Sequence, residues 1–156
     1  MWFCRSGQKY EYYKVMIECN ELFLPWKGFN INLSTLDNKQ DFIQFVKKEK
    51  HIDNTRSIAN WSGQLNTFCN EMAIGDYVLL PEAPGLYSLV KITGEYNYHI
   101  NNVYDLHHGR SFILLKKGIS RTIFPQHIKY TLQAYRTLFR VKNEEEVLSL
   151  IKERSV

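Results

Sequence analysis

The order of the elements that the sequence predicts constrains the fold more than any other feature. Short strand-like segments occur at both ends of the chain, at Met1–Arg5 and Thr137–Lys142, and most of the other strands follow residue 75. The helical segments come early. A doubly wound α/β fold needs a regular alternation of strands and helices, which is absent. The sequence therefore predicts an α+β fold with a compact, curved β-sheet or barrel flanked by helices.

Hydrophobic periodicity and turn residues set the boundaries of these elements. The expected helices are Tyr10–Glu18, Lys39–Lys50, Thr55–Met72 with Asp53 or Asn54 as N-cap, and one that opens at Asn143 with a capping-box pattern. The expected strands are Met1–Arg5, Glu21–Pro25, Asp76–Leu80, Leu86–Glu95, Arg110–Leu115 and Thr137–Lys142. A hairpin is expected around the turn Pro81–Gly85. Residues 1–142 are expected to form one domain, and 143–156 a C-terminal helical extension.

The composition excludes several classes of protein. A formal charge of +4 and a pI near 8.9 permit an anionic partner without requiring one. No apolar run is long enough for a transmembrane helix and no signal peptide is recognisable, so we expect no membrane partner and a cytoplasmic protein. The three cysteines, Cys4, Cys19 and Cys69, are scattered and odd in number, which favours reduced thiols over disulfides or a zinc site.

The sequence gives little support for catalysis. The carboxylates are dispersed, so no cluster is expected to hold a divalent metal, and the glycines are spaced for turns rather than for a phosphate loop. His107 and His108 are adjacent and are better explained as loop histidines than as metal ligands. We therefore expect no enzyme, no catalytic residues, no metal and no cofactor. A small enzyme that uses His108 and Arg110 remains an open alternative.

The helix that contains the stretch IANWSGQLNTF has two distinct faces. Ile58, Trp61, Leu65, Phe68 and Met72 form an apolar stripe, whereas Asn60, Gln64, Thr67 and Glu71 lie on a polar face. Gly63 is expected to permit close approach of a neighbouring segment. A tryptophan on an apolar stripe is more often part of a packed core than of an exposed aromatic surface, but the sequence leaves that choice open for Trp61.

The candidate binding residues lie where strands meet loops. Amide side chains can pair with the edge of a nucleobase, aromatic rings can stack on it, and Lys or Arg can contact phosphates. The predicted base pocket consists of Ser6, Gly7, Trp26, Asn60, Trp61, Gln64, Tyr96 and Tyr98, and the predicted phosphate contacts are Arg5, Lys27 and Arg110. Packing explains Tyr96 and Tyr98 about as well as binding does.

Several blocks of sequence resemble a known family. The blocks MWFCRSG, LFLPWKGF, SIANWSGQLNTFCNEMAIGDYVLLP, YSLVKITGEYNYH, HHGRSFILL and ISRTIFPQHIKYTLQAYRTLFRV together resemble the N-terminal domain of Mrr-type restriction-system proteins. That domain is similar to the EVE and YTH branch of the PUA superfamily. The resemblance covers about residues 1–142. It implies a PUA/EVE-like pseudo-barrel of five to six strands with flanking helices.

The resemblance also implies a function. Such domains act as non-catalytic readers, which hold a modified and flipped base, in DNA or RNA, and direct a nuclease or another effector in trans or in a fusion. The expected role is modified-base recognition, with DNA favoured over RNA, in a restriction or anti-phage defence system. The alternative is a protein-interaction or small-nucleotide-sensing module of a defence system.

Overall fold

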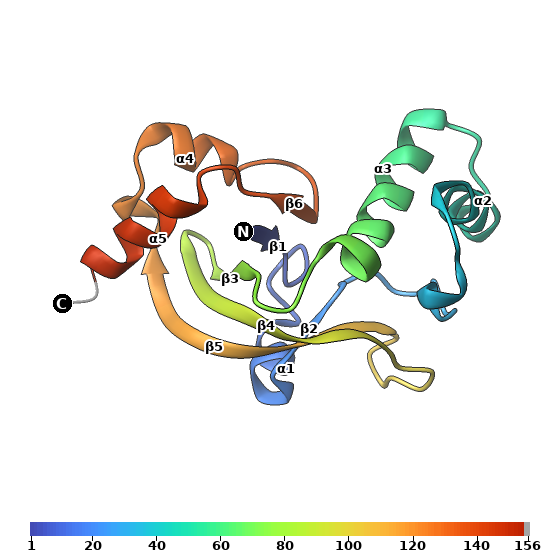
Figure 1. Cartoon of the computed structure of the whole chain (residues 1–156), viewed down its shortest axis with the longest axis horizontal. Coiled ribbons are helices and arrows are strands. Elements are labelled where there is room, and N and C mark those ends of the chain that lie inside the picture. Colours follow the sequence, from blue (N-terminus) through green and yellow to red (C-terminus); the bar gives the residue numbers. More distant parts are fainter. Residues whose placement is uncertain (155–156) are drawn as a thin grey trace.

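The computed structural model describes residues 1–154, which form one curled sheet with helices on its flanks (Figure 1). The strands are β1 (Trp2–Cys4), β2 (Glu21–Phe23), β3 (Tyr77–Ala83), β4 (Leu86–Tyr98), β5 (His108–Ser120) and β6 (Leu138–Arg140). Their order in the sheet is β2-β5-β4-β3-β1-β6, with β1 and β3 parallel and the other neighbours antiparallel. The predicted fold class, an α+β fold with a curved sheet and flanking helices, is confirmed.

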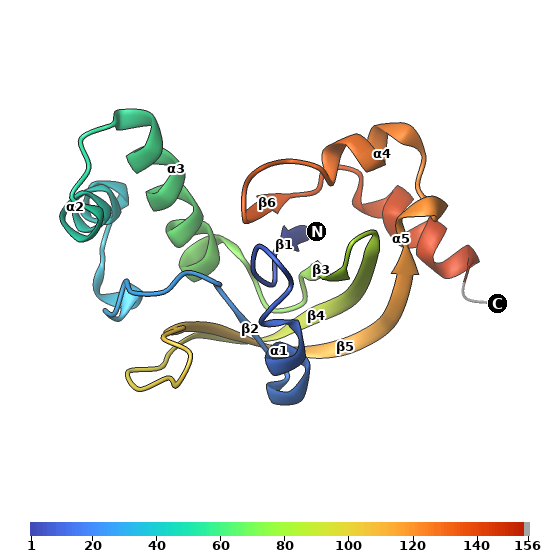
Figure 2. The same ribbon diagram turned by 180° about the vertical axis from the view of Figure 1, so that it is seen from behind.

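Most helices of the described chain lie at the two ends of the long strands. They are α1 (Tyr13–Cys19), α2 (Lys39–Lys50), α3 (Thr55–Asn66), α4 (Gln126–Thr131) and α5 (Glu144–Glu153), with short 3-10 turns η1 (Leu33–Thr35) and η3 (Arg121–Ile123). Figures 1 and 2 show α2 and α3 at one end of β4 and β5, and α4 and α5 at the other. Helix α1 instead lies beside β2, below the middle of the sheet (Figure 1). No helix in the described range is both long and apolar enough to cross a membrane.

Two apolar cores stabilise this arrangement, and β1 contributes to both. Successive side chains of a strand point to opposite faces. Accordingly, Trp2 and Cys4 belong to the core shared with α2 and α3, while Phe3 belongs to the core shared with α4 and α5. Val147 and Ile151 of α5 are buried in this second core. The segment expected to be an extension is therefore packed into the body of the fold.

Several predicted boundaries agree with the structure. Helix α2 has the predicted limits, and α3 begins at Thr55 because the Asn54 side chain accepts a hydrogen bond from the Ser57 amide. The α-helical part of α3 ends at Asn66, however, and continues as one π-helical turn, η2 (Thr67–Glu71). The predicted single helix to Met72 is thus divided.

Other predictions need correction. Helix α4 was not predicted, the hairpin turn is shorter than Pro81–Gly85, and β5 runs five residues further than Leu115. Asn143 makes no side-chain capping bond to the backbone of α5, and its Nδ2 instead donates to the Oε2 of Glu146 at 3.4 Å. Glu144 pairs with the amino group of Met1 at 3.1 Å. Gly63 approaches nothing closely, since a Cβ built there finds no heavy atom within 4 Å.

Candidate nucleic-acid interface

Two adjoining cavities lie along α3, and we name them by their linings. The aromatic cavity has a volume of about 480 Å³ and lies between α3, the loops after β1 and β2, and the segment that precedes β6. The basic groove has a volume of about 1080 Å³ and lies between α2, α3, η2 and β6. Seven predicted site residues line the aromatic cavity: Arg5, Gly7, Trp26, Lys27, Asn60, Trp61 and Gln64.

The indole rings of Trp26 and Trp61 form the aromatic wall. Their centroids are 4.3 Å apart at an interplanar angle of 63°, which is an edge contact. The Nζ of Lys50 lies 4.3 Å from the Trp61 centroid, and the Phe29 ring lies 5.6 Å from it. Trp61 is half-buried, so it both packs on the core and lines the cavity. Both indoles are half-buried and line the cavity, and Lys50 lies over one face of Trp61.

The segment before β6 forms the opposite wall, and predicted site residues hold it in place. The Arg5 side chain donates to the carbonyl oxygens of Ala134 at 2.6 Å and Arg136 at 3.3 Å. The indole N–H of Trp26 donates to the Oγ1 of Thr137 at 3.3 Å. Arg5 is therefore largely occupied by the protein itself.

Gln64 has a comparable structural role. Its Oε1 accepts the buried Leu138 amide at 2.9 Å, and its Nε2 donates to the Oδ1 of Asn60 at 3.2 Å. Both ends of the Gln64 amide are used, and its side chain is buried. Asn60 is exposed, and its Nδ2 has no hydrogen-bond partner within residues 1–154, so this amide is available to a ligand.

Four predicted site residues lie outside the cavity. The Ser6 hydroxyl is fully buried and donates to the Pro81 carbonyl at 2.7 Å. The rings of Tyr96 and Tyr98 both stack on the His108 ring, and the Tyr98 hydroxyl donates to the Oδ1 of Asn30. Neither tyrosine lines the aromatic cavity. These three are corrections to the predicted base pocket, because internal contacts satisfy their polar groups.

The fourth correction concerns Arg110, which was predicted to contact phosphate. It is only 1% exposed, and its guanidinium donates to the carbonyl oxygens of Phe68, Met72 and Gly94 at 2.8–3.1 Å. Burial lowers the pKa of this guanidinium from its usual value. A phosphate contact does not fit this position. Arg110 instead holds η2 to β4.

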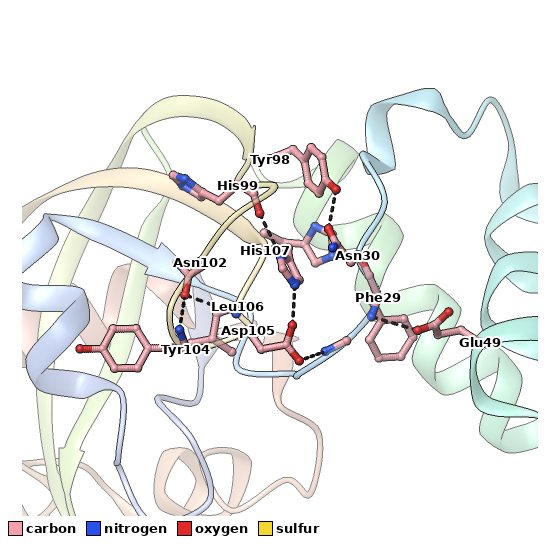
Figure 3. A network of polar contacts seen from close by, with 12 residues as sticks. Phe29, Asn30, Glu49, Tyr98, His99, Asn102, Tyr104, Asp105, Leu106 and His107 are labelled. Atoms are coloured by element: carbon pink, nitrogen blue, oxygen red, sulfur yellow. Dashed lines mark hydrogen bonds and ion pairs between the residues drawn. The ribbon is translucent and has the colours of Figure 1, made fainter.

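A histidine network holds the loop that carries Trp26 (Figure 3). His107 bonds the Asp105 carboxylate at 2.6 Å, and the other Asp105 oxygen accepts the Gly28 amide at 3.0 Å. The His107 hydrogen bond lowers the pKa of Asp105. His108 donates from Nε2 to the Phe29 carbonyl at 2.8 Å. The network therefore connects Gly28 and Phe29, in the loop after β2, to the β4–β5 connection and to the first residue of β5.

The buried imidazole of His108 is held in its neutral form. The Tyr96 hydroxyl donates to its Nδ1 at 2.6 Å, and burial lowers the His108 pKa to about 4. Both ring nitrogens of His108 thus have internal partners, whereas the buried Nη2 of Arg110 has no hydrogen-bond partner among the described residues. No three His, Cys, Asp or Glu side chains of the described chain gather in a way that could hold a metal ion.

The basic groove was not predicted as a site. Its cationic side chains are exposed and come from α2, α3, the segment before β6, and β6; they are Lys39, Arg56, Arg136 and Arg140. None of them forms an ion pair with another residue of the described range. Glu71 is the one acidic residue among the described residues that line the groove.

Tyr135 and Arg136 are the principal residues that sequence reasoning missed. Both line both cavities, and Tyr135 is fully exposed. The available signal was an aromatic residue followed by a cation in a loop next to a strand. Trp26 and Lys27, in the loop after β2, show the same pair of residue types.

One family model matches the chain. No curated protein and no solved structure matches the chain. The matching family model covers residues 2–142, a range that includes all six strands and both cavities and ends before α5. The chain belongs to the family described as a domain of unknown function (DUF8426).

Proposed function

We propose that the chain is a non-catalytic reader of DNA, which holds one flipped and modified base in the aromatic cavity. The observation that carries this proposal is the cavity itself, in which Trp26, the free amide of Asn60 and the cations Lys27 and Arg136 surround one space. The resemblance to Mrr-type proteins extends the proposal. In it, the protein acts in the cytoplasm and directs a nuclease or another effector of a restriction or anti-phage defence system.

The physical chemistry of the cavity supports a single base as its ligand. Its volume of about 480 Å³ lies in the range of pockets that hold small ligands. Stacking of a base on an aromatic side chain contributes about 1–3 kcal/mol. The Asn60 amide can pair with a base edge, while Lys27 and Arg136 are exposed cations that can contact the adjoining phosphates.

Selectivity for a modified base follows from the cost of flipping. Extruding a base from a duplex costs a few kcal/mol, and the cost is lowest for a base that is already unpaired. Each additional buried carbon of a methyl or hydroxymethyl group contributes roughly 1 kcal/mol. A modification that fills the space beside Trp26 therefore offsets part of the free-energy cost of flipping. An unmodified base lacks this contribution.

Binding assays with modified and unmodified oligonucleotides test the proposal. Trp26→Ala should weaken binding of the preferred oligonucleotide by about 5- to 150-fold, the equivalent of about 1–3 kcal/mol of stacking. Tyr130→Ala is the matched control, because Tyr130 is an exposed aromatic residue outside both cavities. If affinity is indifferent to modification, and Trp26→Ala and Asn60→Ala both bind normally, the proposal fails.

A small-nucleotide sensor is the second candidate function. The observation that favours it is the joint presence of an aromatic wall, a free amide and cations in a cavity of this size. A sensor would bind a free nucleotide as tightly as an oligonucleotide, with little dependence on salt. A reader would show the steep salt dependence that follows from counterion release. Calorimetric titration with both ligands at two salt concentrations separates the two functions.

A further inference from the structure

We propose that the basic groove binds a single strand of nucleic acid that continues from the base in the aromatic cavity. This inference rests on the proposed function and names its substrate class. The reader then recognises its base within an unpaired or locally opened strand. An intact duplex is not its preferred ligand.

The first argument is the continuity of the two cavities. The aromatic cavity and the basic groove share four lining residues: Asn60, Gln64, Tyr135 and Arg136. They therefore meet at the middle of α3, where the segment before β6 crosses it. A strand whose base lies beside Trp26 passes directly from this meeting point into the groove. The exposed ring of Tyr135 at the boundary offers a second stacking surface.

The second argument is the distribution of charge. The linings of the two cavities hold six of the 20 Lys and Arg residues of the chain, but only two of its 16 Asp and Glu residues. The rest of the chain holds 14 Lys and Arg residues and 14 Asp and Glu residues. The cavity linings therefore account for the entire formal charge of +4. Such a concentration attracts a polyanion to this face of the molecule.

The third argument is size. The groove volume of about 1080 Å³ is slightly larger than that of pockets that enclose one drug-sized molecule. A few nucleotides of one strand fit such a space, whereas a base-paired duplex does not. The polar groups of Ser57, Asn66 and Thr67 line the same groove and can bond sugars or base edges. An acidic peptide would use the cations but would leave the adjoining aromatic cavity without a partner.

Gly63 allows a test that changes the groove without disturbing the fold. It lies within α3 on the wall of the groove, it is exposed, and a Cβ there meets no heavy atom within 4 Å. Gly63→Glu places a negative charge in the groove, and Gly63→Gln is the neutral control of nearly equal shape. Both residues favour a helix more than glycine does, so both variants should melt at or above the temperature of the unchanged protein.

The measurement is the affinity for single-stranded oligonucleotides of one to eight nucleotides at several salt concentrations. Each phosphate contact in a single strand contributes about −0.7 to the slope of log K against log salt. Gly63→Glu should reduce the magnitude of this slope by about 0.7 and weaken oligonucleotide binding roughly four-fold near 150 mM salt. Gly63→Gln should bind normally. Arg56→Gln should match Gly63→Glu, whereas Lys47→Gln, an exposed cation outside both cavities, should have no effect.

The outcomes separate this inference from the proposed function. The inference is supported if the affinity of the unchanged protein rises with oligonucleotide length and the affinity of Gly63→Glu rises less. If Gly63→Glu binds long oligonucleotides normally while Trp26→Ala does not, the groove inference is wrong and base reading stands. If Trp26→Ala is harmless while Gly63→Glu is impaired, strand binding stands and base reading is wrong. Equal affinity for a duplex, or tighter binding of an acidic peptide, overturns the inference.

Discussion

Acidification should loosen the loop that carries Trp26, and His108 is the group responsible. In the folded protein, the His108 imidazole is buried, accepts a hydrogen bond from Tyr96 and donates one to the Phe29 carbonyl. Burial lowers its pKa from 6.5 to about 4. The unfolded chain therefore takes up a proton at a higher pH than the folded protein does. The contribution of His108 to the free energy of unfolding is fully present above pH 6.5 and is lost as the pH decreases from 6.5 to about 4.

The magnitude follows from the two pKa values. A difference of one pKa unit corresponds to about 1.4 kcal/mol, so the shift from 6.5 to about 4 corresponds to about 3 kcal/mol of unfolding free energy. Asp105 contributes to acid lability only at lower pH, because its carboxyl pKa is lowered from 3.8. A loss of about 3 kcal/mol is a large fraction of the 5–15 kcal/mol that stabilises a typical domain.

Urea denaturation of the unchanged protein and of His108→Gln, at several pH values between about 7.5 and 4.5, measures this effect. Glutamine can keep both hydrogen bonds, since its Nε2 can donate to Phe29 and its Oε1 can accept from Tyr96. It does not titrate, so the variant should lose about 2–3 kcal/mol less than the unchanged protein over this range. All other groups are common to both proteins and cancel. Parallel stability curves for the two proteins would refute this reasoning.

Three further predictions concern stability and are tested by chemical denaturation. Arg110→Met should lower the unfolding free energy by about 3 kcal/mol, because three carbonyl oxygens lose their donor; a loss below about 1 kcal/mol would contradict this role. Gln64→Leu should cost about 1–3 kcal/mol by leaving the buried Leu138 amide unpaired, and an unchanged midpoint would argue against it. Gly63→Ala should add about 1 kcal/mol, and any destabilisation would show that the site is not open.

Local signals explain why much of the fold was predictable. Helix α2 has a clear apolar face and a capping Asn38, and α3 has a capping Asn54, so both starts could be placed from the sequence. Helix α4 has only six residues, which is too short for a periodic pattern. Arg110 reaches the π-helical end of α3 from β5 and donates hydrogen bonds to its carbonyl oxygens. No local pattern predicts such a distant donor.

The candidate site was predictable to a similar extent. Trp26, Lys27 and Asn60 were identified because their residue types are unusual for their local positions, and the structure brings them together. The same reasoning placed Tyr96 and Arg110 in the site incorrectly. The polar end of a side chain on a strand can contact a ligand or an internal partner, and the sequence does not distinguish the two. Tyr135 was missed because its position depends on bonds from Arg5 and Gln64, which hold that segment over α3.

The position of β1 has a consequence for how this chain folds. Trp2 pairs with Val78 on one side and with Arg140 on the other, so β1 lies between strands that are made much later in synthesis. At roughly 5–20 residues per second, a ribosome needs on the order of ten seconds to reach β6. During that time one edge of β1 stays unpaired, and contacts of such long sequence separation also form slowly. Folding of this sheet therefore finishes late, and its open edge is the place where premature association between nascent chains would begin.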